Sequence, residues 1–149
     1  MAIDERIQYF RKMSGMTQEY LGRAVGLPEG SAHTRIAQYE SGARVPKPEM
    51  VKQLAEVLGV SPRALTVGKI NNYVDIAHTL FALEDLLELK AVYIDDIAYL
   101  KAKNGSRLEH VFRLWADKLM QLENGEITKD EYDAWRYTFP RGNRIDGNK

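Results

Sequence analysis

Polar and basic side chains suited to nucleic acid are concentrated in residues 16–47 of this 149-residue chain. They are Gln18, His33, Thr34, Arg35, Gln38, Arg44 and Lys47. A glutamine amide can bond adenine in two places, a threonine methyl can contact thymine, and arginine can bond guanine. Lysine and arginine also hold phosphates without reading the base. These residue types point to DNA binding.

Two short helices are expected to position these side chains. Thr17 can cap the first helix, because its hydroxyl oxygen can accept from an unpaired amide of the first turn. Apolar residues recur at Tyr20, Leu21 and Val25, which is the spacing of a buried helical face. Gly26 follows, where a chain leaving a helix often needs a positive φ.

The second helix is expected to begin near Pro28 or Ser31 and to end before Gly42. Ile36 and Tyr39 would form its buried side. The polar residues from position 33 to position 38 would then form its exposed side. The plainer interpretation, in which this is only the solvated face of an amphipathic helix, stays open.

Two stretches carry a family resemblance. Residues 16–22 read MTQEYLG, and residues 36–46 read IAQYESGARVP. They resemble the phage-repressor-like (XRE) helix-turn-helix family, whose pattern is T-Q-x-x-L-A followed by I-S-x-Y/W-E-x-G-x-R-x-P. Further matches lie before the motif, from Arg6 to Lys12, and after it, from Leu54 to Leu65. The resemblance covers residues 3 to about 69 and implies a five-helix lambda-repressor-like domain.

The resemblance also implies a role for each polar position. Base contacts are expected from His33, Thr34 and Gln38. Phosphate contacts are expected from Gln18, Arg35, Arg44 and Lys47. A structural pair is expected between Arg11 and Glu40, since a guanidinium can hold a carboxylate by two parallel hydrogen bonds.

The chain departs from the family pattern in two places. Gly22 stands where the family usually has alanine, which costs a helix about 1 kcal/mol. Gly26 and Tyr39 are also separated by about four residues more than usual. The addition either lengthens the recognition helix or enlarges the turn before it.

Composition and charge fit an intracellular DNA-binding protein. The chain has no cysteine and no apolar run near the roughly 20 residues that span a bilayer, so we expect a cytoplasmic protein without membrane contact. Residues 1–70 hold ten Lys/Arg against seven Asp/Glu, whereas residues 71–149 hold eleven against fourteen. A mildly basic part is therefore joined to a mildly acidic one.

The remaining sequence predicts a small C-terminal helical domain over residues 70–140, with 1–69 as the DNA-binding domain and 141–149 as a polar tail. Residues 73–89 form an amphipathic pattern expected to pack against their own domain, although a two-fold copy could share it. Residues 91–102 suit a small hairpin or a single edge strand. Residues 107–123 suit a helix, and Thr128 with Glu131 forms a capping box before a last short helix.

No catalytic, metal or cofactor site is expected. The three histidines lie in separate segments without metal-ligand spacing, and no phosphate loop or nucleophile elbow occurs. The adjacent acidic pairs would point apart on a strand or a helix.

The main functional hypothesis is a transcription factor, a repressor, that binds double-stranded DNA as a homodimer at an inverted repeat. The alternative is an antitoxin or another regulatory protein whose C-terminal half binds a different protein. A third, weaker possibility is a small-molecule sensor whose aromatic residues line a pocket.

Overall fold

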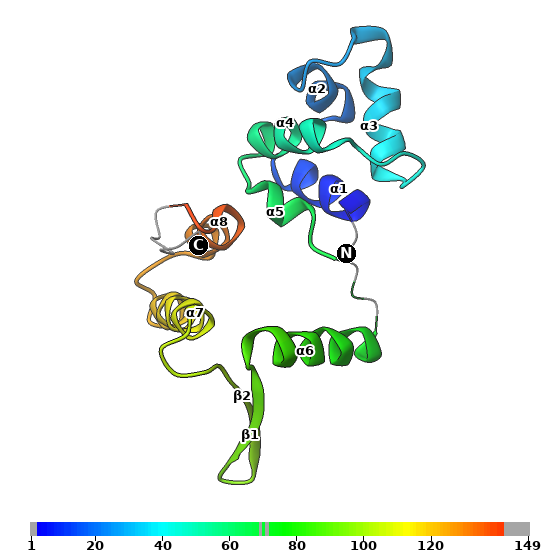
Figure 1. Cartoon of the computed structure of the whole chain (residues 1–149). Helices are drawn as coiled ribbons and strands as arrows, with labels where there is room; N and C mark the ends of the chain where they lie inside the picture. Colours follow the sequence, from blue (N-terminus) through cyan, green and yellow to red (C-terminus); the bar gives the residue numbers. More distant parts are fainter. Residues whose placement is uncertain (1–2, 69, 71, 142–149) are drawn as a thin grey trace. The chain divides into compact units, whose positions relative to one another are not determined.

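The computed structural model describes residues 3–68, 70 and 72–141, and these are mainly helical with one two-stranded sheet. Contacts divide the chain into two units, which are described separately below. Of the described residues, the first unit comprises 3–68, 70 and 136–141. Its helices are α1 (Ile3–Met13), α2 (Gln18–Ala24), α3 (Ala32–Glu40), α4 (Pro48–Leu58) and α5 (Pro62–Leu65), with a 3-10 turn η1 (Glu29–Ser31) (Figure 1). The expected five-helix fold is confirmed.

Local sequence explains the helix ends. The Thr17 hydroxyl accepts from the Tyr20 amide at 3.0 Å and so caps α2 as expected. Ser61 caps α5 in the same way. Gly26 has a φ of 79°, which places it in the left-handed region that favours glycine.

One apolar core holds the five helices together. Its members come from α1 to α5 and from the residue that ends α2, Val25; they are Ile7, Phe10, Leu21, Val25, Ile36, Tyr39, Val51, Leu54, Ala55, Leu58 and Leu65. The expectation for Tyr20 was wrong, because its side chain is 60% exposed. A helix as short as α2 presents one narrow stripe to the core, and Leu21 and Val25 already occupy it.

The extra residues enlarge the turn and do not lengthen the recognition helix. Residues 29–31 form the 3-10 turn η1, and the α-helix begins only at Ala32. Of the two expected starting points, Ser31 is therefore the right one. Figure 1 shows α2 and α3 joined by this turn.

Residues 136–141 contribute to the first unit. Tyr137 packs edge-to-face on Phe10 with ring centroids 4.8 Å apart, and the Ser61 amide donates to the Tyr137 carbonyl at 2.8 Å. Helix α8 (Lys129–Thr138) thus supplies residues to both units. The boundaries at residues 69, 70 and 140 stay a prediction, and the expected polar tail falls almost wholly outside the described residues.

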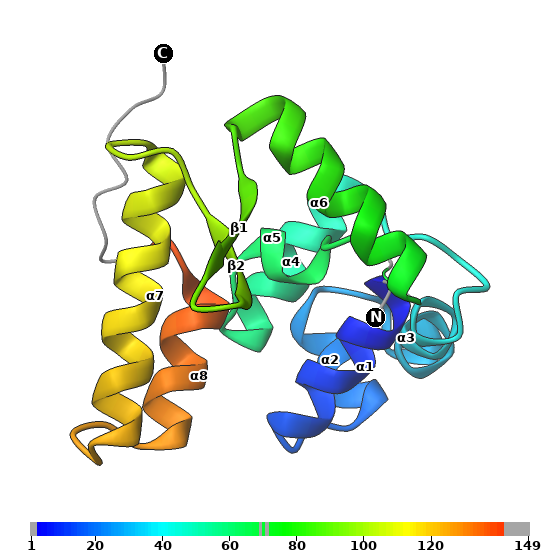
Figure 2. The ribbon, with the colours of Figure 1, turned by 90° about the horizontal axis from the view of Figure 1, so that it is seen from below.

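The second unit runs through residues 72–135 of the described chain. It contains α6 (Tyr73–Leu87), the strands β1 (Lys90–Ile94) and β2 (Ile97–Lys101), α7 (Arg107–Glu123) and the first part of α8. Helices α7 and α8 lie side by side (Figure 2), and the Trp115 indole donates to the Tyr132 hydroxyl at 2.8 Å. The expected capping box is confirmed, because the Glu131 amide donates to the Thr128 hydroxyl and the Thr128 amide donates to the Glu131 carboxylate.

The segment after α6 is a hairpin and not a single strand. Strands β1 and β2 are antiparallel, with Val92 opposite Tyr99 and Ile94 opposite Ile97. Asp95 and Asp96 form the two-residue turn with φ of 49° and 62°. Aspartate tolerates this left-handed backbone better than most residues do.

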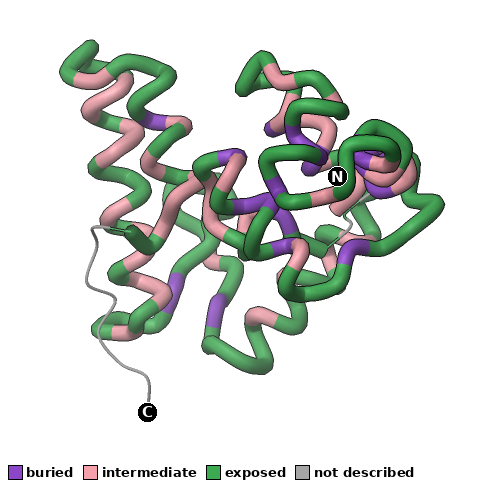
Figure 3. The backbone as a smooth tube through the Cα atoms, turned by 90° about the horizontal axis from the view of Figure 1, so that it is seen from above, coloured by how far each residue is buried: buried purple, intermediate pink, exposed green. Residues whose placement is uncertain are grey.

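Helix α6 buries less apolar surface than its sequence pattern predicts. None of its residues is buried, and Tyr73 and Phe81 are 89% and 57% exposed. In the second unit, buried positions are few along the backbone (Figure 3). The expectation that this stripe packs against its own domain was therefore wrong for most of the helix.

None of the helices in the described residues is both long and apolar enough to cross a membrane.

Candidate DNA-binding surface

Helix α3 separates its core side from its polar side. Ala32, Ile36, Tyr39 and Glu40 recur at helical spacing and are buried. On the remaining surface, the side chains expected to contact bases all have access to solvent. His33 and Thr34 are exposed, and Gln38 is half-buried one turn beyond Thr34.

The backbone of Gln38 fixes the loop that follows α3. Its carbonyl accepts from the Arg44 amide at 3.1 Å and from the Ser41 hydroxyl at 3.3 Å. Gly42 has a φ of 72° and allows the chain to turn back at this point. The loop therefore holds Arg44 at a defined place beside the recognition helix.

A groove between α3, this loop and α4 collects three of the expected phosphate-binding residues. Arg35, Arg44 and Lys47 all line it. Lys47 is also the residue before Pro48, the first residue of α4. Two arginines and a lysine around one groove form a cationic surface that suits a phosphate backbone.

Gln53 is a candidate site residue that the sequence interpretation missed. It lies on α4 and lines the same groove as the three cations. The helical spacing from Glu49, which also lines the groove, was the signal that could have indicated it. Its amide can donate to a phosphate oxygen or to a base edge.

Gln18 lies in a different setting from the other expected phosphate contacts. Its side-chain amide donates to the Glu40 carboxylate at 2.8 Å. The same carboxylate is held by Arg11 through two bonds, from Nε at 2.5 Å and from Nη2 at 3.0 Å. Arg11 also donates to the Met16 carbonyl at 2.7 Å. The expected Arg11–Glu40 pair thus forms and joins α1 to the end of α3.

The pKa values of Arg11 and Glu40 depend on their burial and on the groups that they contact. The side chains of Arg11 and Glu40 are only 12% and 1% exposed. Burial alone raises the pKa of Glu40, but the hydrogen bonds from Arg11 and Gln18 and the Arg11 charge outweigh it, so the pKa lies below its usual value. The pKa of Arg11 is raised, mainly by its hydrogen bond to Glu40. Both groups therefore stay ionised at neutral pH and fix the orientation of the recognition helix.

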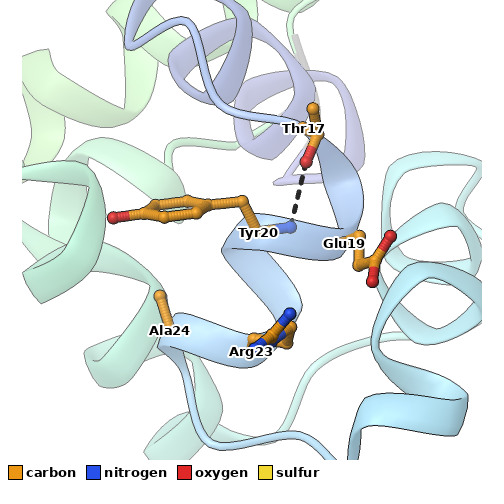
Figure 4. A pocket seen from close by; sticks show the side chains of 5 residues that line it. All are labelled: Thr17, Glu19, Tyr20, Arg23 and Ala24. Atoms are coloured by element: carbon orange, nitrogen blue, oxygen red, sulfur yellow. Dashed lines mark hydrogen bonds between the residues drawn. The ribbon is translucent and has the colours of Figure 1, made fainter.

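A second, shallow surface lies on α2. Thr17, Glu19, Tyr20, Arg23 and Ala24 line it. Figure 4 shows these side chains and the hydrogen bond from the Tyr20 amide to Thr17. It mixes one carboxylate with one guanidinium and so lacks the excess of positive charge found in the α3–α4 groove.

The described residues contain no cluster of three or more His, Cys, Asp or Glu able to hold an ion. The described histidines His33, His78 and His110 lie on three different helices, α3, α6 and α7.

The fold and this surface place the protein in the class of DNA-binding transcriptional regulators with a helix-turn-helix. The helix-turn-helix family model matches residues 7–65, which span α1 to α5. These residues therefore match a helix-turn-helix family in sequence as well as in their order of helices.

Among solved structures, the chain is similar to the crystal structure of the transcriptional regulator BswR. The two sequences are 27% identical, and the match covers 56% of this chain and 94% of that one, with a TM-score of 0.43. No curated protein matches the chain.

Proposed function

We propose that this protein is a cytoplasmic repressor that binds an inverted-repeat operator as a homodimer. The observation that carries the proposal is the continuity of the α3 surface with the α3–α4 groove. Gln38 belongs to the first, its backbone fixes Arg44, and Arg44 lines the second. The face that reads bases and the groove that binds phosphates are thereby held in a fixed position relative to each other.

In this proposal His33, Thr34 and Gln38 contact base edges in the major groove. Arg35, Arg44 and Lys47 bind the flanking phosphates from the groove that they line. Gln18 can serve the DNA only with the amide hydrogen that Glu40 leaves unused. Its main role is to hold Glu40, and its phosphate contact would be the weakest of the four.

A homodimer is favoured because one helix of nine residues reads few base pairs. Two copies would place two α3 helices in successive major grooves, about 34 Å apart, and read an inverted repeat. The second unit supplies the surface for association, because many of its large apolar residues are exposed.

The same exposed apolar surface would also suit the alternative function, that of an antitoxin or a related regulatory protein that binds a different protein. The two functions differ in stoichiometry. A self-sufficient regulator forms a dimer alone, whereas an antitoxin needs its partner to cover the apolar surface.

The test is to select binding sites from random duplex DNA with the full-length protein while measuring its mass in solution. The proposal expects an enriched inverted repeat and twice the 17.0 kDa chain mass. A monomer that enriches no sequence would contradict it and favour the alternative.

A further inference from the structure

The β1–β2 hairpin exposes apolar side chains on both of its faces. Cross-strand partners share a face, so Val92, Ile94, Ile97 and Tyr99 lie on one side and Tyr93 lies on the other with Leu100. Tyr93 is 81% exposed, and Ile94, Ile97, Tyr99 and Leu100 are each about half exposed. An isolated two-stranded hairpin is marginally stable in water, so this one needs further cover.

Both strands are also sheet edges. In the described part of the chain the sheet has two strands, so each strand leaves one row of backbone donors and acceptors unpaired by the other. All five residues of β2 are exposed. An exposed edge of this kind is a template for pairing with another strand.

The charges of the hairpin are separated along its length. Asp95 and Asp96 form the turn, whereas Lys90 and Lys101 face each other at the opposite end. Like charges directly opposite each other destabilise a strand pair. In the described residues neither lysine forms an ion pair within 4 Å, although Glu109 lies in electrostatic range of Lys101 and Glu88 of Lys90. Both carboxylates already bond other cations, Arg113 and Lys103 respectively.

Antiparallel pairing of two hairpins would place the acidic turn of each copy beside the lysines of the other. Exposure favours the β2 edge, because all five residues of β2 are exposed whereas Val92 of β1 is half-buried. Pairing along β2 around Tyr99 would set Lys101 of each copy opposite Ile97 of the other, next to the acidic turn at Asp96. The β2 edge is thus self-complementary under a two-fold axis.

We propose that two copies of this chain join along β2, antiparallel and with the two-fold axis at Tyr99, to form a four-stranded sheet ordered β1–β2–β2–β1. This inference rests on the proposed dimeric function and names the surface that forms the dimer. The acidic turn of each copy lies beside the lysines of the other. The two exposed Tyr99 side chains then meet at the axis.

Because the chain has no native cysteine, a single introduced cysteine can form a protein disulfide only with the same residue of another copy. In full-length Tyr99→Cys, each new thiol would lie opposite its own symmetry mate, with Cβ atoms about 4.5–5.5 Å apart, close to the reach of a disulfide. Mild oxidation should convert most of the protein to a linked dimer. The matched control is Tyr93→Cys, which is more exposed but lies on β1, separated from its mate by three strand spacings of about 4.8 Å. It should remain unlinked.

A double-mutant cycle on two charged residues, Asp96 and Lys101, supplies a second readout. Asp96→Asn removes the charge and keeps a residue that tolerates the turn, and it should weaken the dimer about fivefold. In a Lys101→Glu background the same change should strengthen the dimer, because it removes a repulsion. Within one chain the two groups are about 16 Å apart along the strand, beyond the screening length of about 8 Å, so a reversal of sign reports contact between copies.

The outcomes separate this inference from the function on which it rests. Linkage at Tyr99 with sign reversal supports the β2 interface. A wild-type dimer that selects an inverted repeat but links at Tyr93, or at neither position, overturns the β2 interface and leaves the proposed function standing. A wild-type monomer without operator selection overturns both.

Discussion

Gly22 and Ala32 touch where α2 meets the start of the recognition helix. A Cβ atom placed on Gly22 would lie 2.6 Å from the Ala32 carbonyl oxygen and 2.8 Å from the Ala32 Cβ. The enlarged turn, with η1, delivers Ala32 to this position. Both departures from the family pattern therefore concern the same contact. The longer turn places the Ala32 backbone against position 22, where the family usually has alanine.

We predict that Gly22→Ala destabilises the first unit. Alanine improves helix propensity by about 1 kcal/mol, but overpacking against rigid backbone costs about 1–3 kcal/mol, so the net effect should be a loss. Gly30→Ala is the control, because nothing lies within 4 Å of its added Cβ. Urea unfolding measures both variants. A Gly22→Ala protein as stable as wild type would contradict the contact.

The Arg11–Glu40 pair predicts a pH dependence of stability. Because the folded pKa of Glu40 is depressed, its contribution is fully present above the usual value of 4.5 and is lost as the pH falls through the lower folded pKa. Glu40→Gln should therefore flatten the loss of stability in acid. At neutral pH it should cost about 3 kcal/mol, since it leaves the buried Arg11 charge uncompensated.

The control for this prediction is Glu109→Gln, which breaks an exposed pair with Arg113 on α7. It should leave the stability of the first unit unchanged. Thermal unfolding from pH 7 down to pH 3 compares the variants. Parallel curves for wild type and Glu40→Gln below pH 4.5 would exclude the pair as a source of acid sensitivity.

Gln38→Ala and Arg44→Ala should separate base reading from phosphate binding. Gln38→Ala should lose about 1–3 kcal/mol of discrimination at one base position and leave the salt slope unchanged. Arg44→Ala should weaken all sequences alike and flatten the slope of affinity against salt by about one ion. Arg63→Ala serves as the control, since this exposed cation on α5 does not line the groove. Binding titrations at several salt concentrations decide the matter.

Tyr137→Ala should destabilise the first unit although this residue is far from its helices in sequence. It removes the ring that packs on Tyr9 and Phe10, at a cost of about 2 kcal/mol for a half-buried aromatic side chain. Tyr73→Ala is the control, because that ring is 89% exposed. Calorimetry of both variants measures the difference. An unchanged unfolding transition in Tyr137→Ala would show that the segment around this residue does not stabilise the first unit.

The sequence by itself determined the helix-turn-helix and most of its local geometry. Caps, glycine exits and helical periodicity act over a few residues, so Thr17, Gly26 and the capping box of Thr128 with Glu131 could be identified without coordinates. The family motif added the Arg11–Glu40 pair, because its spacing encodes one particular packing of α1 on α3.

Only the tertiary structure decided which side chains meet across the chain. The use of Gln18 to hold Glu40, the approach of Ala32 to Gly22 and the return of Tyr137 to Phe10 all depend on where distant segments pack. The exposure of Tyr20 and of the α6 stripe has the same cause. Periodicity shows which face of an element is apolar, but whether another element covers that face is set by the whole fold and, in our proposal, by a second copy of the chain.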